Sequence, residues 1–455
     1  MSSMVSAKDL LFGQPVYETH PHKLKPGEVT PGISAQEYHS RRQKFAASLP
    51  NGAVAVLPAA TLKFKSGPVF YPYRQESNFW YLTGWEEPES LTVIEKRDGD
   101  YHFTLFCRPK DERQEQWMGP WSGLQAAKDI FNADAASPIS HVEAELRSIL
   151  KNASYLYTDV DLSTNSTDPL ARPLTDARLP VRSIGPAVNP LRVIKSPAEI
   201  EAMRHVGKIT GRGFNKIMAS GIKSESQTVP LMNLYFSAEG CSGHAYAPIV
   251  ASGRRGLFIH WVQNTGTATD GELMTIDAGA EYGGYVADVT RTWPVNGKFS
   301  TAQKDLYNAV LLAQRKTVSM CRETSSISLN GLHRYAEAEL RANLRDLGFN
   351  MSRGDAITSL LPHHVGHYVG IDVHDVPGYS KSVPLRHGHC ITVEPGVYVP
   401  DDERWPEHFR NMGIRIEDFL CVDEDSAIVF SSSAVKEVDD IENLDWSVGK
   451  EAGEV

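Results

Sequence analysis

The feature that most constrains this chain is a pair of aspartates inside two neighbouring apolar segments. Residues 273–279 (Leu-Met-Thr-Ile-Asp-Ala-Gly) and 285–290 (Tyr-Val-Ala-Asp-Val-Thr) flank a glycine-containing turn, a pattern that predicts a β-hairpin. If the turn is centred on Tyr282-Gly283, Asp277 and Asp288 lie directly opposite each other, with Cβ atoms about 4.5–5.5 Å apart. Two facing carboxylates repel each other unless a cation lies between them. The pattern therefore predicts a site for divalent ions, and the alternative is two solvent-facing aspartates on an edge hairpin.

Histidines are concentrated in residues 363–375, where four of them are interleaved with glycine and apolar residues. They are His363, His364, His367 and His374. A single histidine in such a segment is usually a core residue whose hydrogen bonds are satisfied. Four together instead favour a site lined by imidazoles.

Two glutamates complete the candidate ligand set. Glu394 ends a β-branched segment and precedes a Pro-Gly turn, and a buried carboxylate at such a strand end needs a partner. Strand alternation places Arg415 and Glu417 on one face, where an ordinary surface salt bridge is the alternative. Four carboxylates and one imidazole form an oxygen-rich set that suits Mn²⁺ or Mg²⁺, with Co²⁺ or Zn²⁺ as alternatives.

The length of 455 residues favours two domains. Strand and helix patterns alternate up to about residue 184, which predicts an α/β domain. The predicted helices are 37–49, 141–150, 301–322 and 329–347, and the predicted strands are 53–57, 90–94, 101–106 and 155–158. Residues 185–190 are interpreted as a linker, and the capping box of Ser196 and Glu199 predicts the next helix start.

Composition excludes several classes of protein. A net charge of −10 argues against a nucleic-acid or anionic-membrane surface, and no apolar run is long enough to span a bilayer. The five cysteines show no paired spacing, which fits reduced thiols better than a disulfide framework. The first twelve residues have the features of neither a signal peptide nor a transit peptide, so an imported protein would carry its presequence upstream of this chain.

The ordered set Asp277, Asp288, His367, Glu394 and Glu417 resembles the five-ligand signature of the pita-bread metallopeptidases. The local contexts match as well, among them Ile-Asp-Ala-Gly, Ala-Asp-Val-Thr-Arg-Thr, Val-Glu-Pro-Gly-Val-Tyr and Ile-Arg-Ile-Glu-Asp. Gly-x-Asp-Val-His-Asp at 370–375 and the segment 73–84 are similar to the aminopeptidase P family. The resemblance implies an extended arm (1–36), a creatinase-like α/β domain (37–188) and a pita-bread catalytic domain (189–445).

The resemblance also assigns expected roles to single residues. It implies two divalent ions per chain, with Mn²⁺ foremost, held by Asp277, Asp288, His367, Glu394 and Glu417. Glu394 would also transfer protons. The residues matched to substrate-side positions are His260, His363 and His374, and Arg415 matches an arginine that supports Glu417.

The activity implied is metal-dependent removal of one N-terminal residue, with hydroxide as the nucleophile. Gly13-Gln14-Pro15 and residues 26–32 resemble the mitochondrial branch of the family, whose intermediate-cleaving members remove one bulky residue left by earlier processing. Strict cleavage before a proline in the second position is the alternative, followed by dipeptide-specific prolidase activity. The alternatives from other classes are an inactive pita-bread binding module, which the complete ligand set disfavours, and a phosphoesterase, for which a phosphate-binding loop is missing.

The expected partners are peptide or protein N-termini and, by resemblance, a second copy of the chain in a homodimer. The expected compartment is the mitochondrial matrix, with the cytoplasm or nucleus as alternatives.

Overall fold

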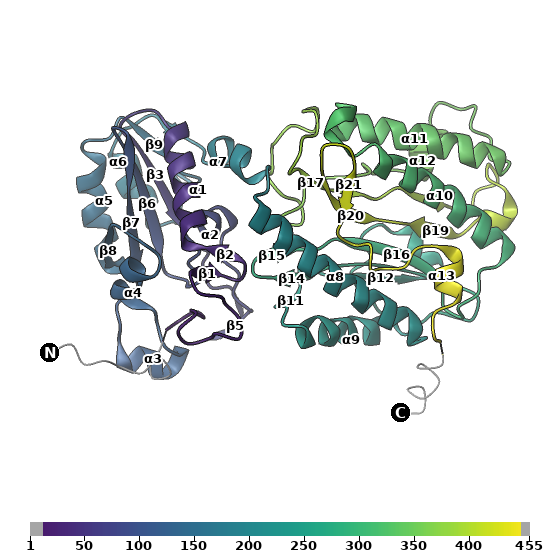
Figure 1. Ribbon diagram of the computed structural model, residues 1–455, viewed down its shortest axis with the longest axis horizontal. Helices are drawn as coiled ribbons and strands as arrows, with labels where there is room; N and C mark the ends of the chain where they lie inside the picture. Colours follow the sequence, from purple (N-terminus) through teal and green to yellow (C-terminus); the bar gives the residue numbers. More distant parts are fainter. Residues whose placement is uncertain (1–11, 447–455) are drawn as a thin grey trace. The chain divides into compact units, whose positions relative to one another are not determined.

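The computed structural model describes residues 12–446, which form two compact units (Figure 1). The first unit ends at Arg192 and the second begins at Val193. Both contain β-sheets covered by helices, so the predicted α/β class is confirmed. Within the described residues, no helix has both the length and the apolar character needed to cross a membrane.

The first unit is built on a six-stranded mixed sheet. Its strands, in spatial order, are β10 (Val181–Arg182), β9 (Tyr155–Tyr157), β3 (Ala53–Pro58), β6 (Leu91–Arg97), β7 (Asp100–Cys107) and β8 (Ala135–Pro138). The β3–β6 and β6–β7 pairs are antiparallel, whereas β9 and β8 pair in parallel with β3 and β7. The strands predicted from alternation are all present.

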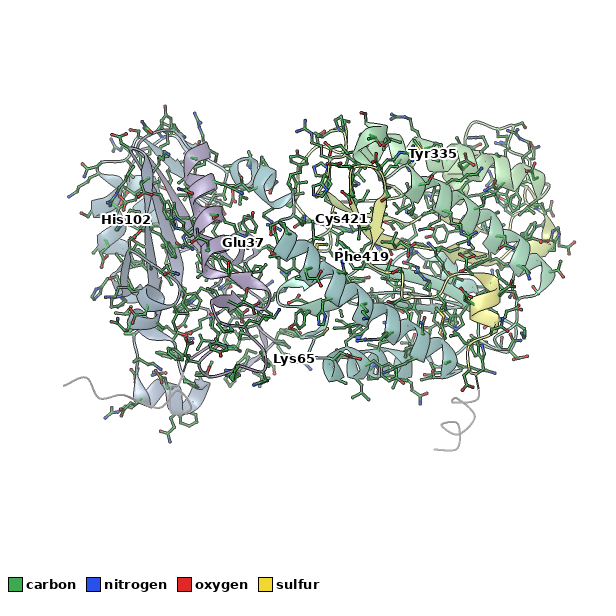
Figure 2. The ribbon with its side chains drawn as sticks, in the orientation of Figure 1. Glu37, Lys65, His102, Tyr335, Phe419 and Cys421 are labelled. Carbon is green, nitrogen blue, oxygen red and sulfur yellow. The ribbon has the colours of Figure 1, made fainter. Side chains whose placement is uncertain are left out.

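Helices cover both faces of this sheet. Val54 and Val56 of β3 pack with Leu146 and Leu150 of α5 (Val142–Leu150) and with Leu174 of α6 (Ala171–Asp176). The other face carries α1 (Ala35–Ser48), on which Figure 2 labels Glu37. Glu37, in the first turn, forms an ion pair with Arg41 at 2.7 Å. The remaining short helices are α2 (Ser77–Thr83), α3 (Glu112–Met118) and α4 (Gly123–Asp129), and β4 (Phe64–Ser66) and β5 (Val69–Phe70) form a separate hairpin.

Residues 12–36 are more structured than the extended arm predicted for them. They contain the hairpin β1 (Glu28–Thr30) and β2 (Ile33–Ser34). The Gln14 side chain donates to the Gly84 carbonyl at 2.9 Å and accepts from the Glu86 amide at 2.7 Å. This part of the segment is therefore held against the first unit, and residues 1–11 of the predicted arm lie outside the described residues.

The predicted linker at residues 185–190 is wrong, because these residues begin the helix α7 (Gly185–Arg192). Pro186 lies in the first turn, where its missing N–H leaves no bond unmade. Asp159 Oδ1 accepts from the Ile184 amide just before the helix, at 3.1 Å. Val188 is fully buried, so tertiary packing stabilises a helix that a composition of Gly, Pro and Asn does not favour.

The second unit contains several small antiparallel sheets. Two three-stranded sheets bring the four predicted carboxylate ligands together, within or next to their strands. They are β12 (Ile249–Ser252) with β13 (Leu273–Ala278) and β16 (Val289–Pro294), and β17 (Cys390–Val393) with β20 (Asp418–Val422) and β21 (Ala427–Val429). The others are β11 (Gly243–His244) with β14 (Ala280–Tyr282) and β15 (Tyr285–Val286), and β18 (Gly396–Val399) with β19 (Met412–Arg415).

The helices of the second unit are α8 (Pro197–Ala219), α9 (Glu225–Ala238), α10 (Thr301–Ser319), α11 (Leu329–Asp346), α12 (Ala356–Leu360) and α13 (Val438–Glu442). Of these, α8 starts where predicted and α10 and α11 begin and end close to the predicted residues, whereas α9, α12 and α13 were not predicted. The capping box of Ser196 and Glu199 is present at the start of α8, as predicted. Gly348 follows α11 with φ +88, a conformation that ends a helix at low cost for glycine.

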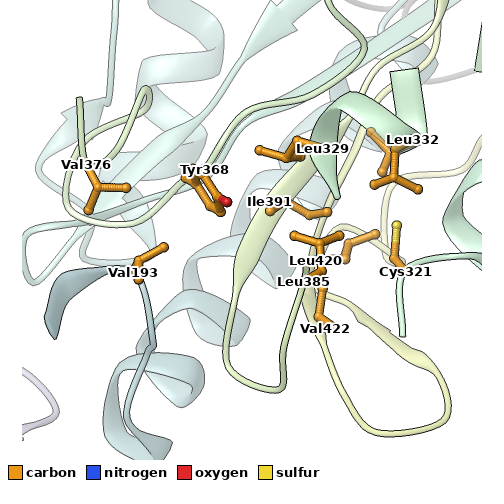
Figure 3. Close-up of a cluster of buried hydrophobic side chains, with 11 residues drawn as sticks. Val193, Cys321, Leu329, Leu332, Tyr368, Val376, Leu385, Ile391, Leu420 and Val422 are labelled. Carbon is orange, nitrogen blue, oxygen red and sulfur yellow. The ribbon is translucent and has the colours of Figure 1, made fainter. Parts of the chain in front are cut away.

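One face of the β17–β20 pair is buried in an apolar cluster. Ile391 and Val393 of β17 and Leu420 and Val422 of β20 pack with Leu329 and Leu332 of α11 (Figure 3). Because side chains alternate along a strand, Thr392 and Phe419 point to the opposite side. Glu394 follows the last residue of β17 and Glu417 precedes the first residue of β20. The same alternation directs both side chains away from the cluster and toward β13 and β16.

Candidate metal centre

The predicted hairpin is present, but its register differs by two residues from the prediction. Asp277 pairs with Thr290, so the turn consists of Gly283 and Gly284 and Asp288 is not directly opposite Asp277. Both glycines have positive φ, 55 and 81, which two-residue hairpin turns favour and residues with a Cβ rarely adopt. A shift of two residues leaves every side chain on its original face. The two aspartates are therefore diagonal neighbours on one side of the hairpin.

A tyrosine that sequence reasoning did not identify joins these two aspartates. The Tyr246 hydroxyl lies 2.6 Å from Asp277 Oδ1 and 2.5 Å from Asp288 Oδ1. Burial, followed by the charges of both aspartates, raises the pKa of Tyr246 well above its ordinary value, so the hydroxyl keeps its proton. Tyr246 lies in the short connection between β11 and β12, where no periodicity or motif marks it.

The two glutamates come from the ends of paired strands. Val393 pairs with Asp418, so the same register extended by one residue brings Glu394 opposite Glu417. Thr290 Oγ1 of β16 donates to Glu417 Oε2 at 2.7 Å, which connects the glutamates to the aspartate hairpin. Asp288, His367 and Glu417 each offer a ligand atom within 4.8 Å of the other two.

His367 is oriented for ligation through Nε2. Its Nδ1 lies 3.0 Å from the Tyr368 carbonyl, which fixes the proton on Nδ1. Its Nε2 lies 3.3 Å from Asp288 Oδ2 and 3.5 Å from Glu394 Oε1. Burial lowers the pKa of His367, but the hydrogen bond to Asp288 and the charge of Glu394 outweigh it and raise this pKa to about 9.

Arg415 contacts a different carboxylate from the one expected. Its Nη2 lies 2.9 Å from Asp277 Oδ2, and its Nη1 donates to the Tyr398 hydroxyl at 2.8 Å. Its Nε donates to Thr290 Oγ1 at 3.1 Å, so it reaches Glu417 only through that threonine. Arg415 therefore pairs directly with Asp277 and supports Glu417 through Thr290, and strand alternation put Arg415 and Glu417 on one face without determining the direct partner.

The site holds more negative charge than its own cations balance. Burial is the main cause that raises the pKa of Asp277 and of Glu417, and it raises the pKa of Glu394 to about 7. Neighbouring carboxylates add to each shift, while Arg415 opposes the shift at Asp277, and His367 and Arg415 oppose it at Glu394. Divalent cations would supply the missing charge, and four carboxylates with one imidazole are ligands that Mn²⁺ accepts. The residues present therefore fit a divalent-metal centre.

The remaining predicted histidines lie around this cluster. His374 packs against His367, with ring centroids 4.3 Å apart. Burial, followed by the charges of His367, Lys381 and His260, lowers the pKa of His374 to about 4, so the ring is neutral at pH 7. His363 Nε2 lies 3.0 Å from the Tyr398 hydroxyl, and its Nδ1 lies 4.0 Å from Glu394 Oε2. His260 is exposed on the loop that joins β12 to β13.

Mn²⁺ is expected to raise the melting temperature of the chelator-treated protein, because the carboxylate cluster exists only in the folded chain. At a free ion concentration 100 times the Kd, the stabilisation is about 2.7 kcal/mol. Scanning calorimetry with EDTA and then with excess Mn²⁺ measures it. Asp288→Asn should abolish the shift and the exposed Asp425→Asn should retain it; a full shift in Asp288→Asn would contradict this centre.

Each of the two units matches a known protein family. Residues 201–424 match the family model of metallopeptidase family M24, and residues 38–157 match that of the aminopeptidase P N-terminal domain. Intermediate cleaving peptidase 55 of Saccharomyces cerevisiae is 39% identical over 450 residues, which cover 95% of this chain and 88% of that protein. Xaa-Pro aminopeptidase 3 of Mus musculus is 36% identical over 459 residues, covering 95% and 90%. The crystal structure of the Saccharomyces protein superposes with a TM-score of 0.87 at 37% identity and covers 93% of this chain and 100% of that one.

Proposed function

The chain belongs to the aminopeptidase P family of M24 metallopeptidases, and from this premise we propose that it removes a single bulky residue from the N-terminus of peptides or processed proteins. The expected family is confirmed, as are the predicted fold, with its pita-bread catalytic domain, and the metallo-aminopeptidase class. The segments at 13–15 and 26–32 that resemble the intermediate-cleaving branch support the choice of substrate.

The observation that carries the proposal is the buried cluster of four carboxylates around His367. We assign Asp277, Asp288, His367, Glu394 and Glu417 as ligands of two divalent ions, with Mn²⁺ as the proposed metal. Such ions supply Lewis acidity that activates water at neutral pH. Tyr246 holds Asp277 and Asp288 in position, and the backbone carbonyl of Tyr368 holds the His367 ring.

Glu394 is the carboxylate placed to exchange protons with a substrate. Its side chain is 17% exposed, compared with 14% for Asp277 and 6% for Asp288, and Glu417 as a whole residue is 1% exposed. Thr392 Oγ1 lies 3.4 Å from Glu394 Oε1 and restrains the carboxylate. From this position Glu394 takes a proton from water and delivers it to the departing peptide nitrogen.

The surrounding histidines bind and orient the substrate, and the buried Arg415 positions the carboxylates through its contacts with Asp277 and Thr290. We assign His374 and His260 to the substrate side, where an imidazole N–H can donate to the carbonyl oxygen as it gains negative charge. His363 is held by Tyr398, which Arg415 also contacts. Beside His260, Phe258 and Val262 expose apolar side chains that suit a bulky residue of the substrate.

Two matched peptide sets test the proposed specificity with the Mn²⁺-loaded and the chelator-stripped protein, read by mass spectrometry. One set begins with Tyr, Leu or Phe and contains no proline, and the other carries proline in the second position. Loss of one residue from the first set, only with metal, is the expected result. Cleavage confined to the second set would instead establish a strict Xaa-Pro aminopeptidase, and no metal-dependent cleavage of either would contradict the enzyme.

We also propose a homodimer in the mitochondrial matrix. The β4–β5 hairpin exposes Phe64, Val69 and Phe70 in the first unit, and a contiguous apolar surface of this kind supports an interface. A monomer by light scattering at micromolar concentration, or a purely cytoplasmic location in cell fractions, would contradict the respective part of this proposal.

A further inference from the structure

Resting on the proposed function, we infer that Glu225 is a positioning residue that sets the place of His260 by tethering the loop between β12 and β13. The loop spans residues 253–272 and contains a short 3₁₀ turn at Gly253–Leu257 and an isolated β-bridge from Thr267 to Ser224. Irregular segments of this length in a compact domain usually carry function. Because such a loop has few backbone bonds of its own, its shape depends on what anchors it.

The Glu225 carboxylate is a fully buried hub at the start of α9. Its Oε1 accepts from the Ser252 amide at 2.9 Å, the Ser252 hydroxyl at 2.7 Å and Arg255 Nε at 2.7 Å. Its Oε2 accepts from Trp261 Nε1 at 2.9 Å and from the Gly266 amide at 2.7 Å. Burial opposes ionisation, but these hydrogen bonds outweigh it and lower the pKa of Glu225. One carboxylate thus joins the beginning, the middle and the end of the loop.

Glu225 anchors the middle of the loop, and Asn264, just beyond it, is held separately by the Val250 amide and the Pro248 carbonyl. Among the hydrogen bonds of the described residues, one connects residues 258–263 to another segment, and it is the bond from the Trp261 indole N–H to Glu225. The others are short-range backbone bonds, from the Phe258 amide to the Arg255 carbonyl and from the Val262 amide to the His260 carbonyl. The position of His260, next to Trp261, therefore follows from the Glu225–Trp261 contact.

The tethered segment presents His260 together with an apolar surface. The Phe258 and Trp261 rings are stacked with centroids 6.0 Å apart, and the Phe258 side chain remains 60% exposed. His260, which the proposed function assigns to the substrate side, directly precedes Trp261 in the chain. Displacement of Trp261 would move the imidazole and the apolar surface together, away from the substrate side of the metal centre.

Two variants of the full-length chain test the tether without the need for catalysis. Glu225→Gln removes the charge and one acceptor, and Trp261→Phe removes only the indole N–H while keeping a ring beside Phe258. Hydrogen–deuterium exchange of peptides covering residues 256–264 should increase in both variants, with the rest of the second unit unchanged. Glu239→Gln, at the other end of α9 and on the surface, is the matched control and should exchange like the wild type.

Kinetic measurements then distinguish an effect of Glu225 on the position of His260 from a general effect on protein stability. Hydrogen bonds to a charged group are strong, so their loss should displace His260 from the substrate side. We therefore expect kcat/KM to fall about 10- to 100-fold in Glu225→Gln and about 10-fold in Trp261→Phe. The loss should divide between kcat and KM as it does in His260→Ala. In the His260→Ala background, Glu225→Gln should have little further effect, since both changes act through the same imidazole.

Unchanged hydrogen–deuterium exchange in residues 256–264 of both variants would overturn the inference. It would also be overturned if the loss of kcat/KM in either variant added fully to that of His260→Ala. If Glu225→Gln does not fold, Trp261→Phe alone decides between these results. Wild-type protein that cleaves neither peptide set would overturn the proposed function instead, and the exchange data would still support or overturn the tether.

Discussion

Replacing Glu394 by glutamine is expected to lower turnover by about 1,000-fold or more while leaving the fold intact. General acid–base catalysis by a positioned side chain contributes about 10²- to 10⁴-fold, and the substitution also weakens a metal ligand. Glutamine has the same size, and it removes one of four neighbouring buried carboxylates. The melting temperature of the metal-free protein should therefore stay the same or rise. Initial rates on the peptide without proline, with saturating Mn²⁺, measure the loss.

The same substitution at Glu403, an exposed residue, is the matched control. Glu403→Gln should retain wild-type turnover. Metal content must be measured in both variants, so that loss of an ion is distinguished from loss of proton transfer. Near-wild-type turnover in Glu394→Gln would contradict the assignment of Glu394.

Asp418→Asn is expected to destabilise the protein by about 3–5 kcal/mol, the cost of breaking a buried ion pair from one side. Asp418 Oδ1 accepts from Arg291 Nη2 at 2.8 Å and from Ser431 at 2.7 Å, and Oδ2 accepts from Gln314 at 2.8 Å and pairs with Lys436. An asparagine leaves the fully buried Arg291 guanidinium without its counter-charge. Urea unfolding of the metal-free protein at pH 7 measures the change.

The pH dependence of this difference has a definite sign. Burial raises the pKa of Asp418, but the charges of Arg291 and Lys436 outweigh it and hold this pKa well below its ordinary range. The stabilisation is therefore complete above the unfolded-state pKa of about 3.9 and is lost as the pH falls further. The difference in free energy of unfolding between the wild type and Asp418→Asn should become smaller as the pH falls from 4 to 2. Asp425→Asn, an exposed control, should have nearly the wild-type free energy of unfolding at every pH. An equal loss of stability in both variants would contradict a role for the buried network.

The Asp418 network also shows why the ligands stay aligned. Arg291 lies next to Thr290 and donates to its carbonyl at 3.0 Å, and it also contacts the carbonyl of Glu417. The pair therefore joins β16 to β20 directly behind two residues of the metal centre. The sequence identified Glu417 as a candidate ligand but assigned no role to the next residue, Asp418, because a charged residue at such a position is usually exposed to solvent.

Sequence alone determined the candidate ligands of the proposed metal centre and the strand face that Asp277, Asp288, Glu394 and Glu417 occupy. Strand periodicity is a local property, so Asp277 and Asp288 were correctly placed on one side even though the turn was misplaced by two residues. Helix starts such as Ser196 were predictable for the same reason, because the capping interactions lie within one turn.

Only the tertiary structure decided which of these side chains contact each other. Tyr246 lies 31 and 42 residues from the aspartates it joins, and Arg415 is 138 residues from Asp277. Glu225 likewise reaches Trp261 and Gly266 across 36 and 41 residues. Contacts at such separations depend on how whole elements pack, and periodicity within one element carries no information about them. The ligand types could therefore be predicted from the chain, whereas the hydrogen bonds that hold the ligands in place came from the packing of the second unit.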